Sequence, residues 1–187
     1  MLFTQPCTPR AAAPERPARP IASALRWALI ATAPLLMAQA APQPDEAARI
    51  LAAHNAARAS LGLDPLRWNA TLAAQAEQWA EQVARVDRLH HGLGSGSGQG
   101  ENLWMGTRER FTVEEMVGRW VAEKQLFRHG RFPHNSLTGD WAAVGHYTQI
   151  VWRRTREVGC SLARGVRNDV LVCRYHEAGN VEGEWPY

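Results

Sequence analysis

Apolar residues recur at helical spacing in the segment that follows the two prolines Pro42 and Pro44. A first helix is expected over residues 45–61, because Ile50, His54 and Ala57 fall on one face of it. His54 lies on this apolar face, so we expect it to be a core histidine bonded to the backbone. The helix needs a partner surface on that side.

Two further helices follow the same logic. Asn69 can cap a second helix, and Thr112 with Glu115 forms a capping-box pair that opens a third, expected to run to about Arg128. The second helix has its apolar period at Leu72, Ala76, Trp79, Val83 and Val86.

The remaining pattern favours strands. Residues 143–152, 157–163 and 169–175 are rich in β-branched and aromatic side chains and are separated by turns. The glycine- and serine-rich stretch 90–100 predicts a flexible loop. Helices followed by strands predict an α+β layered domain.

The positive charge belongs to the N-terminal segment. The chain has 21 basic and 18 acidic residues, and residues 1–40 alone contribute four arginines against one glutamate, so the remainder is neutral. An apolar run ending in Ala38-Gln39-Ala40 follows these arginines, which is typical of a signal peptide. We therefore expect a signal peptide at 1–40, a linker at 41–44 and one domain at 45–187.

The neutral domain excludes a nucleic-acid partner, since no basic surface motif remains. An uncleaved membrane anchor over residues 27–41 is the alternative to cleavage, but that stretch is short and alanine-rich for a span. After cleavage we expect no membrane span and a monomer.

The cysteine count agrees with export. Removal of a leader containing Cys7 leaves Cys160 and Cys173, which we expect to form a disulfide in a secreted or periplasmic protein. A bridge closing a loop of this length typically stabilises a fold by about 3 kcal/mol.

Five residues are candidates for chemistry, although each is ordinary by itself. Glu123 falls at the edge of the third helix's apolar stripe, where a carboxylate needs a partner, such as an arginine. Glu101 follows the flexible loop, His90 and His91 precede it, and His146 lies in the first predicted strand.

Longer motifs change the weight of these candidates. In order, the chain contains His54-Asn55-x-x-Arg58, Pro65-Leu66-x-Trp68, Gly100-Glu101-Asn102-Leu103, Trp120-x-x-Glu123, Gly145-His146-Tyr147-Thr148-Gln149-Ile150-Val151-Trp152, Gly159-Cys160 and Gly179-Asn180-Val181. This series resembles the CAP family, which includes the cysteine-rich secretory proteins, the antigen 5 allergens and the plant pathogenesis-related 1 proteins. The resemblance spans nearly the whole domain.

The resemblance implies a three-layer α-β-α sandwich with a central antiparallel sheet. It also implies a cleft tetrad of His91, Glu101, Glu123 and His146. His91 is preferred to His90 because the family pattern is Leu-x-His followed by a small residue. Within the tetrad, His91 and His146 would be the ligands of Zn²⁺ or another divalent cation.

Two classes of function remain at this point. A ligand-binding module would hold a divalent metal in the cleft, and a sterol, another lipid or an extracellular protein elsewhere, with Trp104, Met105, Phe111 and Trp141 as candidate contacts. A metal-dependent hydrolase or protease would instead use Glu101 and Glu123 for catalysis. The binding module is preferred, because a shared cleft does not establish shared chemistry.

Overall fold

The computed structural model describes residues 44–92 and 97–187. The expected signal peptide at 1–40, its Cys7 and most of the linker at 41–44 lie outside these residues. Within the described part of the chain, no helix has both the length and the apolarity needed to cross a membrane.

Within residues 44–92 and 97–187, the domain contains four α-helices and four strands. The helices are α1 (Pro44–Ala59), α2 (Ala70–Val86), α3 (Val113–Ala122) and α4 (Gly145–Ile150). Two 3-10 turns, η1 (Glu123–Gln125) and η2 (Trp141–Ala143), follow α3 and precede α4. The strands are β1 (Arg67–Trp68), β2 (Gly100–Thr107), β3 (Glu157–Arg164) and β4 (Asn168–His176).

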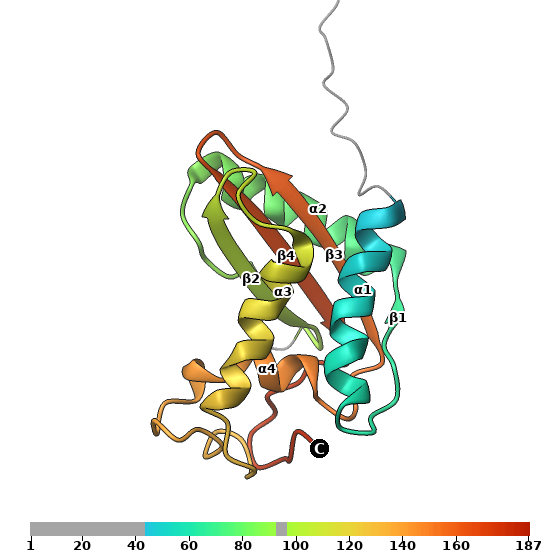
Figure 1. Ribbon diagram of the computed structural model, residues 1–187, viewed down its shortest axis with the longest axis vertical. Coiled ribbons are helices and arrows are strands. Elements are labelled where there is room, and N and C mark those ends of the chain that lie inside the picture. The colour runs from blue at the N-terminus through green and yellow to red at the C-terminus, as the bar shows by residue number, and fades with distance from the viewer. Residues whose placement is uncertain (1–43, 93–96) are drawn as a thin grey trace, which may run out of the picture. The chain divides into compact units, whose positions relative to one another are not determined.

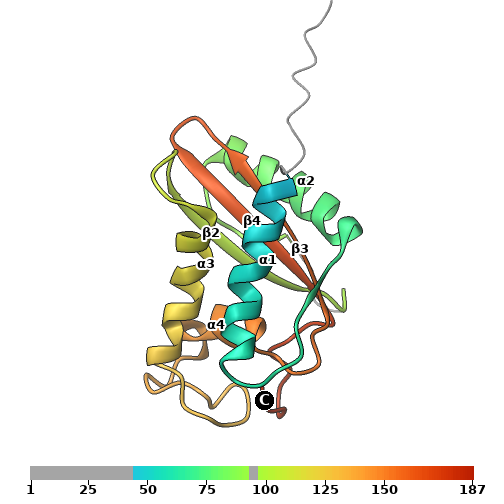
Figure 2. The same cartoon turned by 45° about the vertical axis from the view of Figure 1, so that its right-hand side comes forward.

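The strands form one sheet in the order β1-β3-β4-β2. The three long strands are antiparallel, whereas the two-residue β1 pairs in parallel with β3. Helix α2 covers one face, and α1 and α3 cover the other, with α4 below them (Figure 1). The turned view in Figure 2 shows the same three layers, so the expected sandwich is confirmed.

Successive side chains of β4 point to opposite faces of the sheet and so contribute to two hydrophobic cores, one on each face. Val170 and Val172 point toward α2, while Leu171, Cys173 and Tyr175 belong to the larger core beneath α1 and α3. All five side chains are fully buried. The sheet is therefore apolar on both faces and needs a helical layer on each.

The predicted helix caps are confirmed. Asn69 accepts hydrogen bonds from the amides of Thr71 and Leu72, and Thr112 and Glu115 make both bonds of a capping box. Helix α3 nevertheless ends at Ala122, short of Arg128, because its last turn tightens into η1.

Two sequence-based assignments were wrong. Residues 143–152 do not form a strand, since η2 ends within them and α4 spans Gly145–Ile150. This helix lies inside the protein, so Tyr147, Thr148, Gln149 and Ile150 are all buried and no helical period is visible. The second error is smaller: the loop predicted over 90–100 extends one residue too far, because β2 begins at Gly100, and no element had been predicted for the rest of this strand.

The expected disulfide joins the two central strands. Cys160 and Cys173 face each other in the β3–β4 register, and their sulfur atoms are bonded. Both residues are fully buried under α1 and α3. The bridge therefore lies inside the larger core and fixes the register of β3 against β4.

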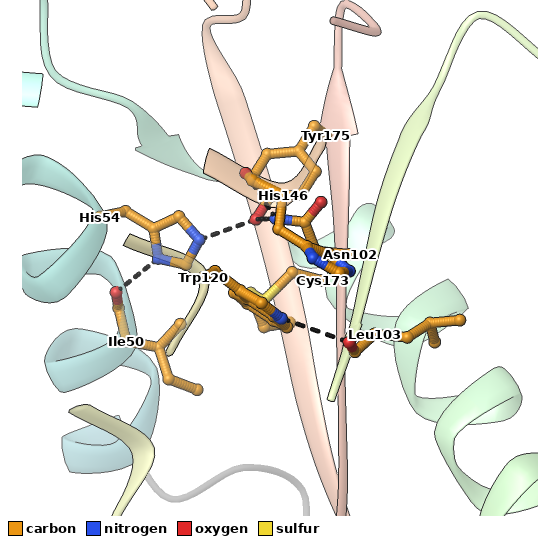
Figure 3. Close-up of a disulfide and its surroundings, with 9 residues drawn as sticks. Ile50, His54, Asn102, Leu103, Trp120, His146, Cys173 and Tyr175 are labelled. Atoms are coloured by element: carbon orange, nitrogen blue, oxygen red, sulfur yellow. Dashed lines mark hydrogen bonds between the residues drawn. A yellow bond between two sulfur atoms is a disulfide. The ribbon is translucent and has the colours of Figure 1, made fainter. Parts of the chain in front are cut away.

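Helix α1 carries polar side chains into this core. His54 is completely buried, with Nδ1 2.8 Å from the carbonyl oxygen of Ile50 and Nε2 2.8 Å from the hydroxyl of Tyr175 (Figure 3). The prediction of a core histidine is thus confirmed. Burial lowers the pKa of His54 to about 4, helped by the charge of Arg58.

We predict that Gly159→Ala destabilises the protein. A Cβ at this position would lie 2.2 Å from the amide nitrogen of Ala73 and 2.5 Å from the carbonyl oxygen of Asn69, so α2 would have to move off β3. The expected loss is about 1–3 kcal/mol in the free energy of unfolding, measured by urea denaturation.

The matched control is Gly118→Ala in α3, where a Cβ meets nothing within 4 Å. This change should stabilise by about 0.5–1 kcal/mol. Equal effects of the two changes would refute the close approach.

We also predict that the protein loses stability in acid through His54. The unfolded chain takes up a proton on this ring near pH 6.5, but the folded protein does so only near pH 4. Stability should therefore fall as the pH drops from 6.5 to 4, by up to about 3 kcal/mol. Urea denaturation at several pH values in this range should show that the free energy of unfolding depends less steeply on pH in His54→Gln than in the wild type. If the variant keeps the pH dependence of the wild type, His54 is not the group responsible.

Candidate functional site

A cleft of about 640 Å³ opens at one end of the edge strand β2. Three members of the expected tetrad line it, namely His91, Glu101 and His146. Glu123 is not among the lining residues and instead bonds His146. The structure thus brings all four residues to one place, but as two His–Glu pairs.

The first pair holds His146. One carboxylate oxygen of Glu123 lies 2.6 Å from Nδ1 of His146, and the other accepts the backbone amides of His146 and Tyr147, each at 3.0 Å. Trp120 stacks on the imidazole, with ring centroids 5.8 Å apart and planes inclined by 19°. Glu123 therefore ties the end of α3 to the start of α4.

The second pair holds His91. Glu101, whose side chain is only 3% exposed, accepts from Nδ1 of His91 and from the amide of Gly92, both at 2.9 Å, through one oxygen. Nη2 of Arg174 lies 3.4 Å from the other oxygen, and the β2–β4 register sets Arg174 opposite Glu101. This buried carboxylate is thus compensated by a cation from the next strand.

The two pairs share one chemical consequence. A carboxylate only accepts hydrogen bonds, so Nδ1 of each ring must carry the proton, and Nε2 of the neutral ring keeps its lone pair. Carboxylate–histidine pairs of this kind orient metal-binding imidazoles. One oxygen of Glu101 and both oxygens of Glu123 are used in these hydrogen bonds.

The neighbouring His90 lies elsewhere. Its Nδ1 is 2.8 Å from the carbonyl oxygen of Arg88, and its ring packs edge-on against Trp79 at 4.9 Å. His90 does not line the cleft, whereas His91 does.

Close packing around Gln149 forms the wall of the cleft between β2 and the C-terminal segment. Gln149 accepts from the amide of Gly179 at 2.8 Å and donates to Thr155 at 3.2 Å. A Cβ on Gly100 would lie 1.9 Å from the Gln149 side-chain oxygen. The glycine that opens Gly100-Glu101-Asn102-Leu103 is therefore required by this approach.

Of the four candidate contact residues, only Trp141 is exposed in the cleft. Its side chain is 46% exposed and packs edge-on against Phe132, which also lines the cleft. Trp104 is buried in the core against Phe111, and Met105 packs beside α2.

Several residues of the site escaped sequence reasoning. Arg174, Tyr175 and Asn102 lie on strands. Only the β2–β4 register shows which residue of the neighbouring strand lies opposite each of them. The basic residue within the apolar run of β4 was the available signal for Arg174. Trp120 is buried in the core, and its contact with His146 was not predicted from the sequence.

A further group of metal-ligating side chains meets within the described residues. His54, Cys160 and Cys173 place ligand atoms within 4.8 Å of one another. The two sulfurs are bonded together, so neither is the thiolate that a metal requires. This group is consequently not a metal centre in the oxidised protein.

Known proteins are similar to this chain in sequence. Residues 51–175 match the family model of the "Cysteine-rich secretory protein family" (CAP). Pathogenesis-related protein 1C of Nicotiana tabacum is 38% identical over 138 residues, covering 73% of this chain and 78% of the relative. Pathogenesis-related protein 1 of Arabidopsis thaliana is 35% identical over 154 residues, covering 82% and 88%.

Solved structures agree on the architecture. "Crystal structure of NaASP2 with Zn2+" superimposes with a TM-score of 0.66 at 22% identity, covering 80% of this chain and 88% of the other. Venom allergen-like protein 4 of Schistosoma mansoni gives a TM-score of 0.59 at 24% identity, covering 78% and 95%. At these identities the likeness shows the fold alone. The family match over residues 51–175 and the sequence relatives establish that this chain belongs to the CAP family of cysteine-rich secretory proteins, a family of extracellular, defence-related proteins.

Proposed function

We propose that this protein is an extracellular binding module whose cleft holds a divalent cation, best matched by Zn²⁺. The supporting observation is the pairing of both cleft histidines with carboxylates through Nδ1. Each ring then offers Nε2, and neutral imidazole nitrogen is a preferred zinc ligand.

The donor set fits the cation in two respects. His91 follows α2, His146 belongs to α4 and both line the same cleft, so a single ion could be shared between them. Glu101 and Glu123 would act from behind the rings, holding their orientation and raising their basicity. NaASP2, which has the same fold, was crystallised with Zn²⁺. The proposal for this chain rests on its own donor set.

Two histidines leave coordination positions for other groups. A bound cation would therefore give the cleft a Lewis-acidic point for an anionic or carbonyl group of a ligand. The exposed Trp141 beside Phe132 adds an apolar surface at the same opening. This combination favours recognition of a ligand over turnover, because both carboxylates are engaged in orienting the histidine rings.

A zinc titration tests the metal site. Wild-type protein should bind one Zn²⁺ per chain near neutral pH in isothermal titration calorimetry. His91→Ala and His146→Ala each remove half of the donor set and should abolish binding. Glu123→Gln should weaken it by about 10–100-fold, the range typical of outer-sphere partners.

The matched control is His90→Ala, which removes the adjacent imidazole outside the cleft and should leave affinity unchanged. Circular dichroism should confirm that each variant is folded. Absence of zinc uptake by the wild type, or loss of uptake in His90→Ala, would refute the proposed site.

A groove between α1 and α3 supports lipid binding as a second candidate. It measures about 330 Å³, at the small end of ligand pockets, and its apolar wall includes Ala53, Ala57, Val117 and Val121. Small side chains leave this space open at Gly118, where a Cβ would meet nothing within 4 Å. An acyl chain is the simplest ligand for such a surface.

Displacement of a fluorescent fatty acid tests the groove. Saturable binding should persist in the presence of EDTA, because the groove does not include the cleft histidines. Gly118→Trp should fill the groove and lower affinity at least about tenfold, whereas Gly118→Ala should not. Unchanged binding in Gly118→Trp would exclude this groove.

A further inference from the structure

We propose that a buried hydrogen-bond relay from α1, made by His54, Tyr175 and Asn102, positions His146 for ligand binding in the cleft. These three are positioning residues: His54 and Tyr175 do not line the cleft, and Asn102, which does, directs its side-chain amide to the carbonyl of His146. The inference rests on the proposed function, in which His146 is a metal ligand.

The relay runs from helix α1 through the sheet strands β4 and β2 to helix α4. His54 of α1 contacts the hydroxyl of Tyr175 on β4 at 2.8 Å. Nδ2 of Asn102 on β2 lies 3.1 Å from that hydroxyl and 3.1 Å from the carbonyl oxygen of His146. Figure 3 shows these side chains converging beside the disulfide. The last bond reaches the first turn of α4.

Only one arrangement of protons satisfies every group. The carbonyl of Ile50 can only accept, so Nδ1 of His54 donates to it and Nε2 accepts. Tyr175 must then donate its hydroxyl proton to Nε2 and accept from Asn102. The second amide proton of Asn102 goes to His146. Because every hydrogen bond in the relay has a fixed donor and acceptor, the relay specifies one position for the carbonyl group of His146.

Burial makes this relay costly to disturb. His54 and Tyr175 are completely buried and Asn102 is 2% exposed, so a broken bond leaves a polar group without water. Desolvation lowers the pKa of His54 and raises that of Tyr175, so both side chains stay neutral near pH 7. The relay therefore persists without any charge that salt could screen.

A second polar contact from α1 fixes the other end of α4. Arg58, one helical turn after His54, donates to the carbonyl oxygens of Ile150 and Trp152, each at 2.9 Å. Helix α4 is thus held at its start through the relay and at its end by Arg58. Three contacts therefore fix His146: Glu123 bonds Nδ1, Trp120 stacks on the ring face, and the relay bonds the backbone carbonyl.

Tyr175→Phe is the test, because it removes one relay hydroxyl and keeps the ring. Zinc affinity should fall about tenfold, at the low end of outer-sphere effects, since Tyr175 acts through Asn102. In metal-free protein, hydrogen exchange of the His146 and Tyr147 amides should accelerate relative to amides in α2. The ring ¹⁵N signals of His146 should also shift.

The matched control is Tyr187→Phe, which removes the hydroxyl of a partly buried tyrosine that bonds the Tyr147 side chain outside the relay. It should change neither zinc affinity nor these exchange rates. If Tyr175→Phe does not fold, His54→Leu carries the same test from α1, since it removes the acceptor for the Tyr175 hydroxyl.

The outcomes separate the relay from the metal site. Wild-type zinc affinity in a folded Tyr175→Phe protein, or equal loss in Tyr187→Phe, would overturn the relay. If wild-type protein binds no zinc, the metal proposal fails, and the metal-free exchange rates and ring signals decide the relay alone. Unchanged rates and signals would then overturn it.

Discussion

The interior of this domain depends on how one guanidinium is buried. Arg58 is completely inaccessible to solvent, and its nitrogens donate to the carbonyl oxygens of Asp64, Ile150, Trp152 and Thr155. Burial lowers its pKa to about 10, which still leaves it charged near neutral pH. A buried cation without such partners would cost several kcal/mol. The chain after α1 and the end of α4 must therefore converge on this side chain, and that convergence fixes where α4 ends.

The location of the cleft follows from this placement of α4. Glu101 and Arg174 belong to the α2 side of the sheet, whereas Asn102 and Tyr175 belong to the α1 side, because neighbouring residues on a strand face opposite ways. The edge strand β2 is where both sides are accessible from one opening. His91 reaches it from the end of α2 and His146 from α4, so the two layers each contribute one His–Glu pair. A site of this kind is assembled only when both layers are docked.

Much of this arrangement was readable from the sequence, for physical reasons that also explain the errors. Helices α2 and α3 keep an apolar stripe and have side-chain caps, so period and caps identified them. The last four residues of α4 are all buried, and its β-branched and aromatic residues mimic a strand. The motif resemblance supplied His91, Glu101, Glu123 and His146 as a group. It could not show that Glu123 lies outside the cleft lining, or that Arg174 compensates Glu101, because both depend on register and on the position of α4.

Register gives the disulfide a role beyond stability. Cys160 and Cys173 are opposite each other, and the bond between them excludes a slip of β3 against β4. A one-residue slip reverses every side chain across the sheet. It would turn Tyr175 away from His54 and bring Arg174 into the apolar core beneath α1. The bridge therefore protects two separate partnerships, the ion pair behind His91 and the hydrogen bond from Tyr175 to His54, although it lies in neither. In an extracellular domain that must keep a polar site open at the edge of its sheet, covalent control of register is what allows the two faces of β4 to serve the same cleft.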